Sequence, residues 1–87
     1  MHVIAMYDVG EKRVAKVLKI FRKYLIWIQR SVFEGDITEA KLEQLKQELR
    51  PLIKSDYDSV LFFKIRSEKA FKKESMGVEF DPLSSFL

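Results

Sequence analysis

The sequence predicts an α+β fold of the ferredoxin-like type, in which a four-stranded antiparallel sheet carries two helices on one face. The chain has 87 residues, which is enough for one domain. Hydrophobic patterns of strand and helix period follow one another in the order βαββαβ. We therefore assign residues 1–80 to this domain, including a C-terminal strand appendage, and residues 81–87 to a tail that docks on a partner chain.

The first strand is predicted over residues 3–7, where every side chain is apolar or aromatic. Because strand side chains alternate between the two faces of a sheet, each face receives its own set. One face takes Val3, Ala5 and Tyr7, and the other takes Ile4, Met6 and Asp8. Since both sets are mainly apolar, we expect both faces to be covered.

A helix is predicted next, over residues 11–24. Apolar residues recur there at helical spacing and form one buried stripe, made of Val14, Val17, Leu18, Phe21 and Leu25. Lysines form a second stripe on the opposite side, made of Lys12, Lys16, Lys19 and Lys23. The lysine stripe is either an ordinary solvated face or a contact surface for nucleic-acid phosphates.

Two antiparallel strands are predicted over residues 25–29 and 32–36, which are rich in aromatic and β-branched side chains. The turn at residues 30–31 lacks glycine, so one kinked strand is the alternative. Gly35 marks either a bulge or the end of the strand.

The second helix is predicted to begin after Thr38, a good N-cap residue, and to end before Pro51. Its buried stripe consists of Leu42, Leu45, Leu49 and Leu52. A last core strand follows over residues 59–66, with Leu61, Phe63 and Ile65 on one face and Val60, Phe62 and Lys64 on the other.

The C-terminal residues 67–87 and the uncovered face of the sheet predict a partner chain. Residues 67–75 are polar with at most one helical turn, residues 76–80 suit a short strand, and residues 81–87 end in apolar side chains. Two helices can cover only one face of the sheet, so we expect a second sheet to pack on the other. This predicts a symmetric homodimer.

Composition limits the possible chemistry and location. The chain has no cysteine and one histidine, so thiolate and histidine-rich zinc sites are excluded, and only carboxylates remain to hold magnesium, manganese or calcium. The absence of cysteine, of a signal-peptide pattern and of a membrane-spanning run indicates a cytoplasmic protein that does not enter a membrane.

The charge is unevenly distributed. The net charge is only +3, but residues 11–30 contain seven basic residues and one acid, whereas residues 36–58 contain four basic residues and six acids. A concentrated positive segment suits a polyanion such as DNA or RNA.

Asp8 is the main candidate for chemistry because it is the only acid in the first strand and stands at its carboxyl end. It either faces water, caps the following helix or meets a cation. One carboxylate is a poor metal site, but two Asp8 carboxylates near a dimer axis would share a cation. Arg13 either reaches a phosphate or pairs with Asp8. Ser31 is a turn residue, or a nucleophile if a base lies beside it.

Several stretches together resemble the small CRISPR-associated Cas2 family. They are MHVIAMYDV at residues 1–9, WIQRSVFEG at residues 27–35, DSVLFFKI at residues 58–65, and the MG pair at residues 76–77. The resemblance covers nearly the whole chain, at the expected size and order. A toxin-type ribonuclease family of similar fold is a weaker match.

The resemblance implies a ferredoxin-like homodimer that acts in CRISPR spacer acquisition, part of antiviral defence. Such a dimer bridges two dimers of the Cas1 integrase and helps to hold incoming DNA. Some members are described as endoribonucleases or DNases that depend on Mg²⁺ or Mn²⁺. Their proposed nuclease site corresponds to Asp8 as metal ligand, with Tyr7, Arg13, Ser31 and Phe33.

One position departs from the family pattern. Some nuclease-active relatives have a basic residue where this chain has Trp27, and we expect Arg30 to face another way. The alternative to a nuclease is an adaptor that binds nucleic acid without catalysis.

Overall fold

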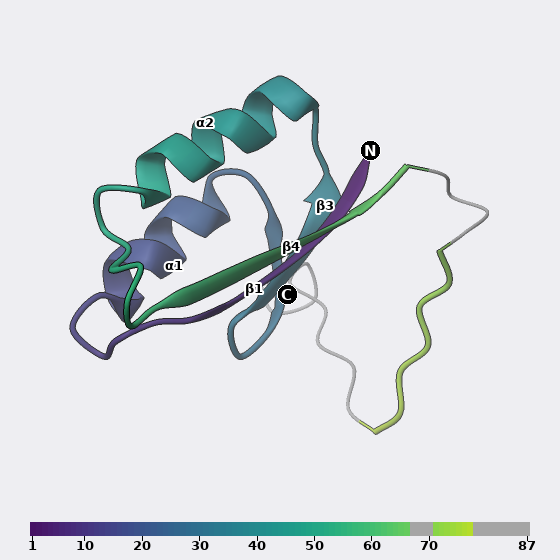
Figure 1. Ribbon diagram of the computed structural model, residues 1–87. Helices are drawn as coiled ribbons and strands as arrows, with labels where there is room; N and C mark the ends of the chain where they lie inside the picture. The colour runs from purple at the N-terminus through teal and green to yellow at the C-terminus, as the bar shows by residue number, and fades with distance from the viewer. Residues whose placement is uncertain (67–70, 78–87) are drawn as a thin grey trace.

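The fold consists of one sheet and two helices, described by a computed structural model over residues 1–66 and 71–77. The elements are β1 (His2–Asp8), α1 (Val14–Arg22), β2 (Ile26–Gln29), β3 (Val32–Asp36), α2 (Glu39–Leu49) and β4 (Ser59–Ile65). The strands pair antiparallel in the order β2-β3-β1-β4, and both helices lie on the same side of the sheet (Figure 1). The predicted α+β ferredoxin-like fold is confirmed.

The core lies between the sheet and the helices. The alternation predicted for β1 is correct, because Val3, Ala5 and Tyr7 are buried. Phe21 of α1 sits against two of the rings below it, with centroid distances of 5.1 Å to Phe33 and 5.3 Å to Tyr7. Stacked aromatic rings add to the energy of apolar burial. The predicted stripe of α2 is also buried, at Leu42, Leu45 and Leu49.

The first helix is shorter than the apolar pattern predicted, since α1 begins at Val14 rather than residue 11. Residues 11–13 form a turn, in which the Arg13 N–H donates to the Gly10 carbonyl at 2.8 Å. Asp58 holds this turn from outside by accepting the Gly10 N–H and the Arg13 side chain. The helix gives way to a tighter turn at Lys23, whose N–H reaches the Ile20 carbonyl at 3.1 Å.

The predicted hairpin is present as β2 and β3. Arg30 makes the tight turn in the left-handed backbone region, with φ of 47°, which is uncommon for a residue other than glycine. The register shift lies on β2, between Trp27 and Gln29, and not at Gly35. Gly35 is paired with Val3 within β3, which ends one residue later.

The second helix follows its predicted signals. The Thr38 hydroxyl oxygen accepts the Lys41 N–H at 3.1 Å, so the N-cap prediction is confirmed. The helix ends at Leu49, two residues before Pro51. On β4, Val60 and Phe62 pack against the core, whereas Leu61 and Phe63 point to the other face of the sheet.

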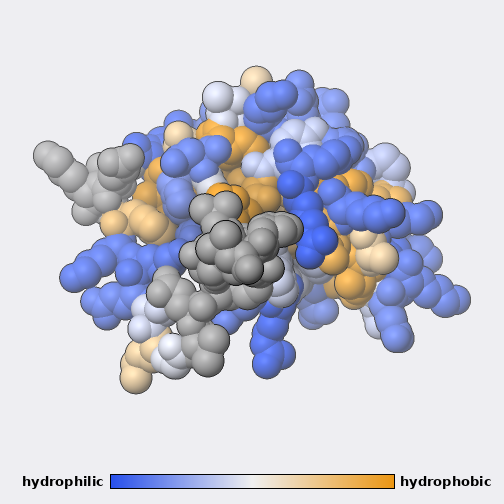
Figure 2. All heavy atoms as spheres, turned by 180° about the vertical axis from the view of Figure 1, so that it is seen from behind, coloured by the Kyte–Doolittle hydropathy of each residue, from blue (hydrophilic) through white to orange (hydrophobic). Residues whose placement is uncertain are grey.

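That other face, which we call the open face, carries exposed apolar side chains. Ile26 is 57% exposed, and Leu61 and Phe63 are each 50% exposed. Seen from behind, the surface shows several hydrophobic areas among mostly hydrophilic side chains (Figure 2). These side chains have the character of a surface that another chain covers.

A short C-terminal segment lies against one end of the open face. The Phe71 ring is 4.5 Å from the His2 ring, and Lys73 pairs with Glu34. Burial alone would raise the pKa of Glu34, but hydrogen bonds from Lys73 and His2 outweigh it and lower that pKa. Residues 71–77 form neither helix nor strand.

Other predictions for the C-terminal part concern residues that the structure does not describe. Residues 78–80 of the predicted strand, the tail at residues 81–87 and part of the predicted polar turn lie outside the described residues. Over the ranges 1–66 and 71–77, no helix combines the length and apolar character needed to cross a membrane.

Candidate functional site

Asp8 ends β1 with its side chain in water. It pairs in register with Ser59 of β4 and shares the open face with Met6, Ile4 and His2. Its carboxylate forms no hydrogen bond or ion pair with any other described residue. Of the three situations considered for Asp8, the structure shows an acid that faces water, which leaves both oxygens available to a ligand.

Asp58, and not Asp8, is the acid that binds the loop before α1. Its side chain has no exposed area, and its carboxylate accepts the N–H groups of Gly10 at 2.8 Å and Lys54 at 2.9 Å. Arg13 donates to it twice, from Nε and Nη2, both at 2.7 Å. One carboxylate thus joins the loop before α1 to the loop before β4.

The Asp58 pairing determines what Arg13 can do. The hydrogen bonds from the guanidinium hold the pKa of Asp58 well below its usual range and raise the pKa of Arg13. Arg13 therefore pairs with Asp58 and not with Asp8, which corrects one of the two expectations for it. Only its remaining N–H groups can approach a phosphate.

Only a weak signal in the sequence points to Asp58. Aspartates in turns often accept backbone N–H groups nearby, but residues 54–58 contain two of them. Nothing in the spacing selects Asp58 over Asp56 or joins it to Arg13.

Three other predicted site residues lie at or behind the same end of the sheet. The Ser31 carbonyl accepts the Tyr7 N–H at 3.2 Å, which places the β2–β3 turn beside the end of β1. The Tyr7 ring is only 8% exposed, and burial raises the pKa of its hydroxyl, against a smaller opposing effect of Arg22. Phe33 has no exposed area and lies 6.2 Å from Tyr7 between ring centroids. Tyr7 and Phe33 therefore lie in the core on the opposite face of the sheet from Asp8, and they can affect Asp8 only through packing.

The predicted lysine stripe is on the surface but is not uniform. All four lysines are exposed. Lys23 is paired with Glu48, which also accepts the Tyr24 hydroxyl, and these two hydrogen bonds lower the pKa of Glu48. Within the described part of the chain, Lys12, Lys16 and Lys19 have no such acidic partner. These three lysines are the available cations of the stripe.

The Trp27 position has a cation close by. The guanidinium carbon of Arg22 lies 6.0 Å from the Trp27 ring centre, and the indole N–H donates to the Arg30 carbonyl at 2.7 Å. A basic group thus stands near Trp27, although it comes from α1 and not from β2.

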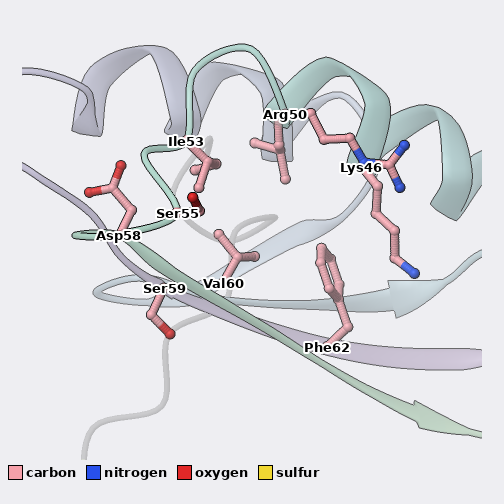
Figure 3. Close-up of a pocket in the computed structure, with 9 residues that line it drawn as sticks. Lys46, Arg50, Ile53, Ser55, Asp58, Ser59, Val60 and Phe62 are labelled. Atoms are coloured by element: carbon pink, nitrogen blue, oxygen red, sulfur yellow. The ribbon is translucent and has the colours of Figure 1, made fainter.

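A hollow of about 420 Å³ lies between the end of α2 and β4 (Figure 3). Lys46 and Arg50 reach over Val60 and Phe62, and the Lys46 ammonium is 5.6 Å from the Phe62 ring centre. The Asp58 carboxylate points away from these side chains. Because its one acid is already bound to Arg13, we do not place the chemistry in this hollow.

The donor set of one chain does not make a complete metal site. Among the described residues, no three His, Asp or Glu side chains are grouped as metal ligands. The free carboxylate of Asp8 nevertheless has the hard oxygen atoms that Mg²⁺ and Mn²⁺ prefer. A site therefore requires a second carboxylate, and a second copy of Asp8 would provide it.

Over the described residues, the ferredoxin-like fold, the free strand-end acid and the lysine stripe define a small α+β protein with an unpartnered acid and an exposed basic surface. Comparison with known proteins agrees with this class. Residues 1–73 match the family model described as CRISPR associated protein Cas2, and the chain belongs to this family.

Relatives and solved structures support the assignment along the whole chain. A Thermotoga maritima protein named CRISPR-associated endoribonuclease Cas2 is 54% identical over 79 residues, which are 91% of each chain. A Pyrococcus furiosus protein of the same name is 40% identical over the full length of both chains. A crystal structure of Cas2 superposes with a TM-score of 0.83 at 39% identity, covering 94% of this chain and 92% of the other.

Proposed function

We propose that this protein is a homodimeric adaptor of CRISPR spacer acquisition that binds DNA and bridges dimers of the Cas1 integrase. The observation that carries the proposal is a set of three available lysines, with Lys16 and Lys19 on α1 and Lys12 in the turn just before it. Cations without acidic partners attract phosphates and release counterions on binding. Membership of the Cas2 family gives the biological setting.

The open face supports the homodimer. Ile26, Leu61 and Phe63 are half exposed or more on this face of the sheet, and a second copy would cover them. Asp8 ends a strand on this face, and a two-fold axis near that strand end would also bring a second Asp8 into reach.

Sedimentation velocity tests the adaptor role. The protein is run alone, with a fluorescent duplex, and with the duplex and a Cas1 integrase. We expect a dimer alone, a dimer on the duplex, and a larger complex in which all three components move together. A monomer that does not bind the duplex would contradict the proposal.

A second function is favoured by the free Asp8 carboxylate and by the endoribonuclease name of the relatives. In this function the protein is a metal-dependent endonuclease acting on RNA or DNA. Two Asp8 carboxylates would hold Mg²⁺ or Mn²⁺, and the cation would stabilise negative charge on the phosphodiester. Arg13 would orient the phosphate with its remaining N–H groups, while Tyr7, Ser31 and Phe33 would hold the end of β1 in place.

Comparison of Asp8→Asn with the original protein tests this second function. Labelled RNA and DNA are incubated with each, with Mg²⁺ or with chelator, and Mn²⁺ binding is measured separately by calorimetry. Asp36→Asn is the matched control, because Asp36 is an exposed acid at the end of β3. We expect only Asp8→Asn to lose both cleavage and metal binding. Equal cleavage by all three proteins would assign the activity elsewhere.

A further inference from the structure

A second hollow, of about 400 Å³, lies beside the Asp58 network. It is lined by residues 10–13 of the loop before α1 and by Lys54, Asp56 and Tyr57 of the loop before β4. Gly10, at its edge, follows Asp8 by two residues. The hollow therefore adjoins the strand end that carries the candidate acid.

Tyr57 presents an aromatic ring to water at this hollow. The residue is 75% exposed, which is unusual for a large aromatic side chain, and it is not part of the core. The Arg13 guanidinium carbon lies 5.9 Å from its ring centre. Tyr57 thus offers an open ring surface with a cation beside it.

The loop that carries Tyr57 is well anchored. The N–H groups of Tyr57 and Asp58 both donate to the Lys54 carbonyl, at 3.0 Å and 2.7 Å. The Asp58 carboxylate in turn accepts the Lys54 N–H at 2.9 Å and fixes Arg13. A ring on such a turn loses little conformational freedom when a ligand stacks on it.

Lys12 and Lys54 supply the charge of the hollow. Both are exposed, and neither has an acidic partner among the described residues. Arg13 contributes less because Asp58 occupies its guanidinium. Glu11 and Asp56 also line the hollow and offset these two charges, so a phosphate there depends on direct contact with the two ammonium groups and a long phosphate track is not favoured.

We propose that this hollow binds one unpaired nucleotide of a single-stranded nucleic acid. The base stacks on Tyr57, and the adjoining phosphate faces the ammonium groups of Lys12 and Lys54. Stacking on aromatic side chains is tolerant of base identity and requires a base that is not paired. The inference rests on the proposed function, since it takes nucleic acid as the ligand, and it directs an unpaired strand toward Asp8.

Fluorescence anisotropy tests the proposal with three labelled probes, an oligo-dT, an oligo-U and a blunt duplex. Tyr57→Ala removes the ring, Tyr57→Leu keeps apolar volume without a ring, and Tyr57→Phe is the matched control. We expect Tyr57→Ala and Tyr57→Leu to weaken single-strand binding at least about fivefold, the lower end of the cost of losing one base–aromatic stack. Tyr57→Phe should bind like the original protein, and duplex binding should not change.

The outcomes distinguish failure of this nucleotide site from failure of the proposed adaptor function. A loss confined to oligo-dT or to oligo-U supports the site and identifies DNA or RNA as the source. Unchanged single-strand binding by both ring-less variants, or an equal loss on the duplex, would overturn the site while leaving the adaptor function in place. If the original protein bound none of the three probes, the proposed function would fail and the site with it.

Discussion

The Arg13 guanidinium and the Asp58 carboxylate form a two-point ion pair, with Nε–Oδ2 and Nη2–Oδ1 distances of 2.7 Å, between residues 45 apart in sequence. The same carboxylate accepts the backbone N–H groups of Gly10 and Lys54. The pair therefore fixes the loop that follows Asp8 and the loop that contains Tyr57. Both proposed binding regions depend on this one buried acid.

Asp58→Asn should lower the urea midpoint of unfolding markedly. The substitution removes the charge that Arg13 faces and replaces one acceptor oxygen by a donor group, which leaves backbone N–H groups without their partner. Asp56→Asn is the matched control, since Asp56 is an exposed acid in the same loop, and it should change the midpoint little. Equal midpoints for the two variants would show that the network does not stabilise the fold.

Acid should destabilise the protein through the same residue. The pKa of Asp58 is lowered in the folded state from its ordinary value of 3.8, chiefly by the Arg13 hydrogen bonds. Its stabilising contribution is therefore complete above about pH 5 and is lost progressively as the pH falls below that value. Urea titrations between pH 7 and pH 3 should show a smaller loss for Asp58→Asn than for the original protein. Parallel losses would rule out Asp58 as the titrating group.

Phe33 and Tyr7 should act on the candidate site only through packing. Phe33→Ala opens the stack with Phe21 and should cost about 3–5 kcal/mol of the free energy of unfolding, measured by urea denaturation. Tyr7→Phe keeps the ring and removes only a hydroxyl, so it should retain any cleavage rate. A large loss of cleavage in a fully folded Tyr7→Phe variant would instead give that hydroxyl a direct role.

The parts of the fold that periodicity specifies were predictable. The βαββαβ order, the inward face of β1 and the Thr38 cap follow from local patterns and are present. The predicted start of α1 at residue 11 was wrong because a distant acid, Asp58, holds residues 10–13 in a turn. Local apolar spacing contains no information about that long-range hydrogen bonding.

The candidate site was predictable only in part. Asp8 and the lysine stripe were visible because both follow from position within one element. The Lys23–Glu48 and Arg13–Asp58 pairs join separate elements, so they depend on how the helices and loops pack. Tyr57 was overlooked for a similar reason, since its exposure and its cationic neighbours appear only in the folded chain.

Charged substitutions on the open face should separate the dimer. Phe63→Lys places a cation where we expect a second sheet to pack, and sedimentation equilibrium should then report a monomer. Val14→Lys is the control, because Val14 is 37% exposed on α1, which lies on the opposite side of the sheet. A Phe63→Lys variant that remains dimeric would place the interface on another surface.

Lys23 should contribute less to DNA binding than Lys16. Glu48 already pairs with Lys23, so DNA must compete with that acid, whereas Lys16 has no acidic partner among the described residues. Affinities of Lys16→Ala and Lys23→Ala for one duplex at low salt give the comparison. The opposite order would mean that DNA follows the Glu48 side of α1.

The salt dependence of duplex binding tests the central claim most directly, that α1 binds nucleic-acid phosphates. The original protein is compared with the Lys16→Ala/Lys19→Ala double variant, and Lys41→Ala on α2 serves as the control. The slope of log affinity against log salt should become shallower by about 0.9 for each phosphate that the double variant no longer neutralises, and stay unchanged in the control. Identical slopes and affinities for all three proteins would contradict a role for α1 in binding nucleic acid.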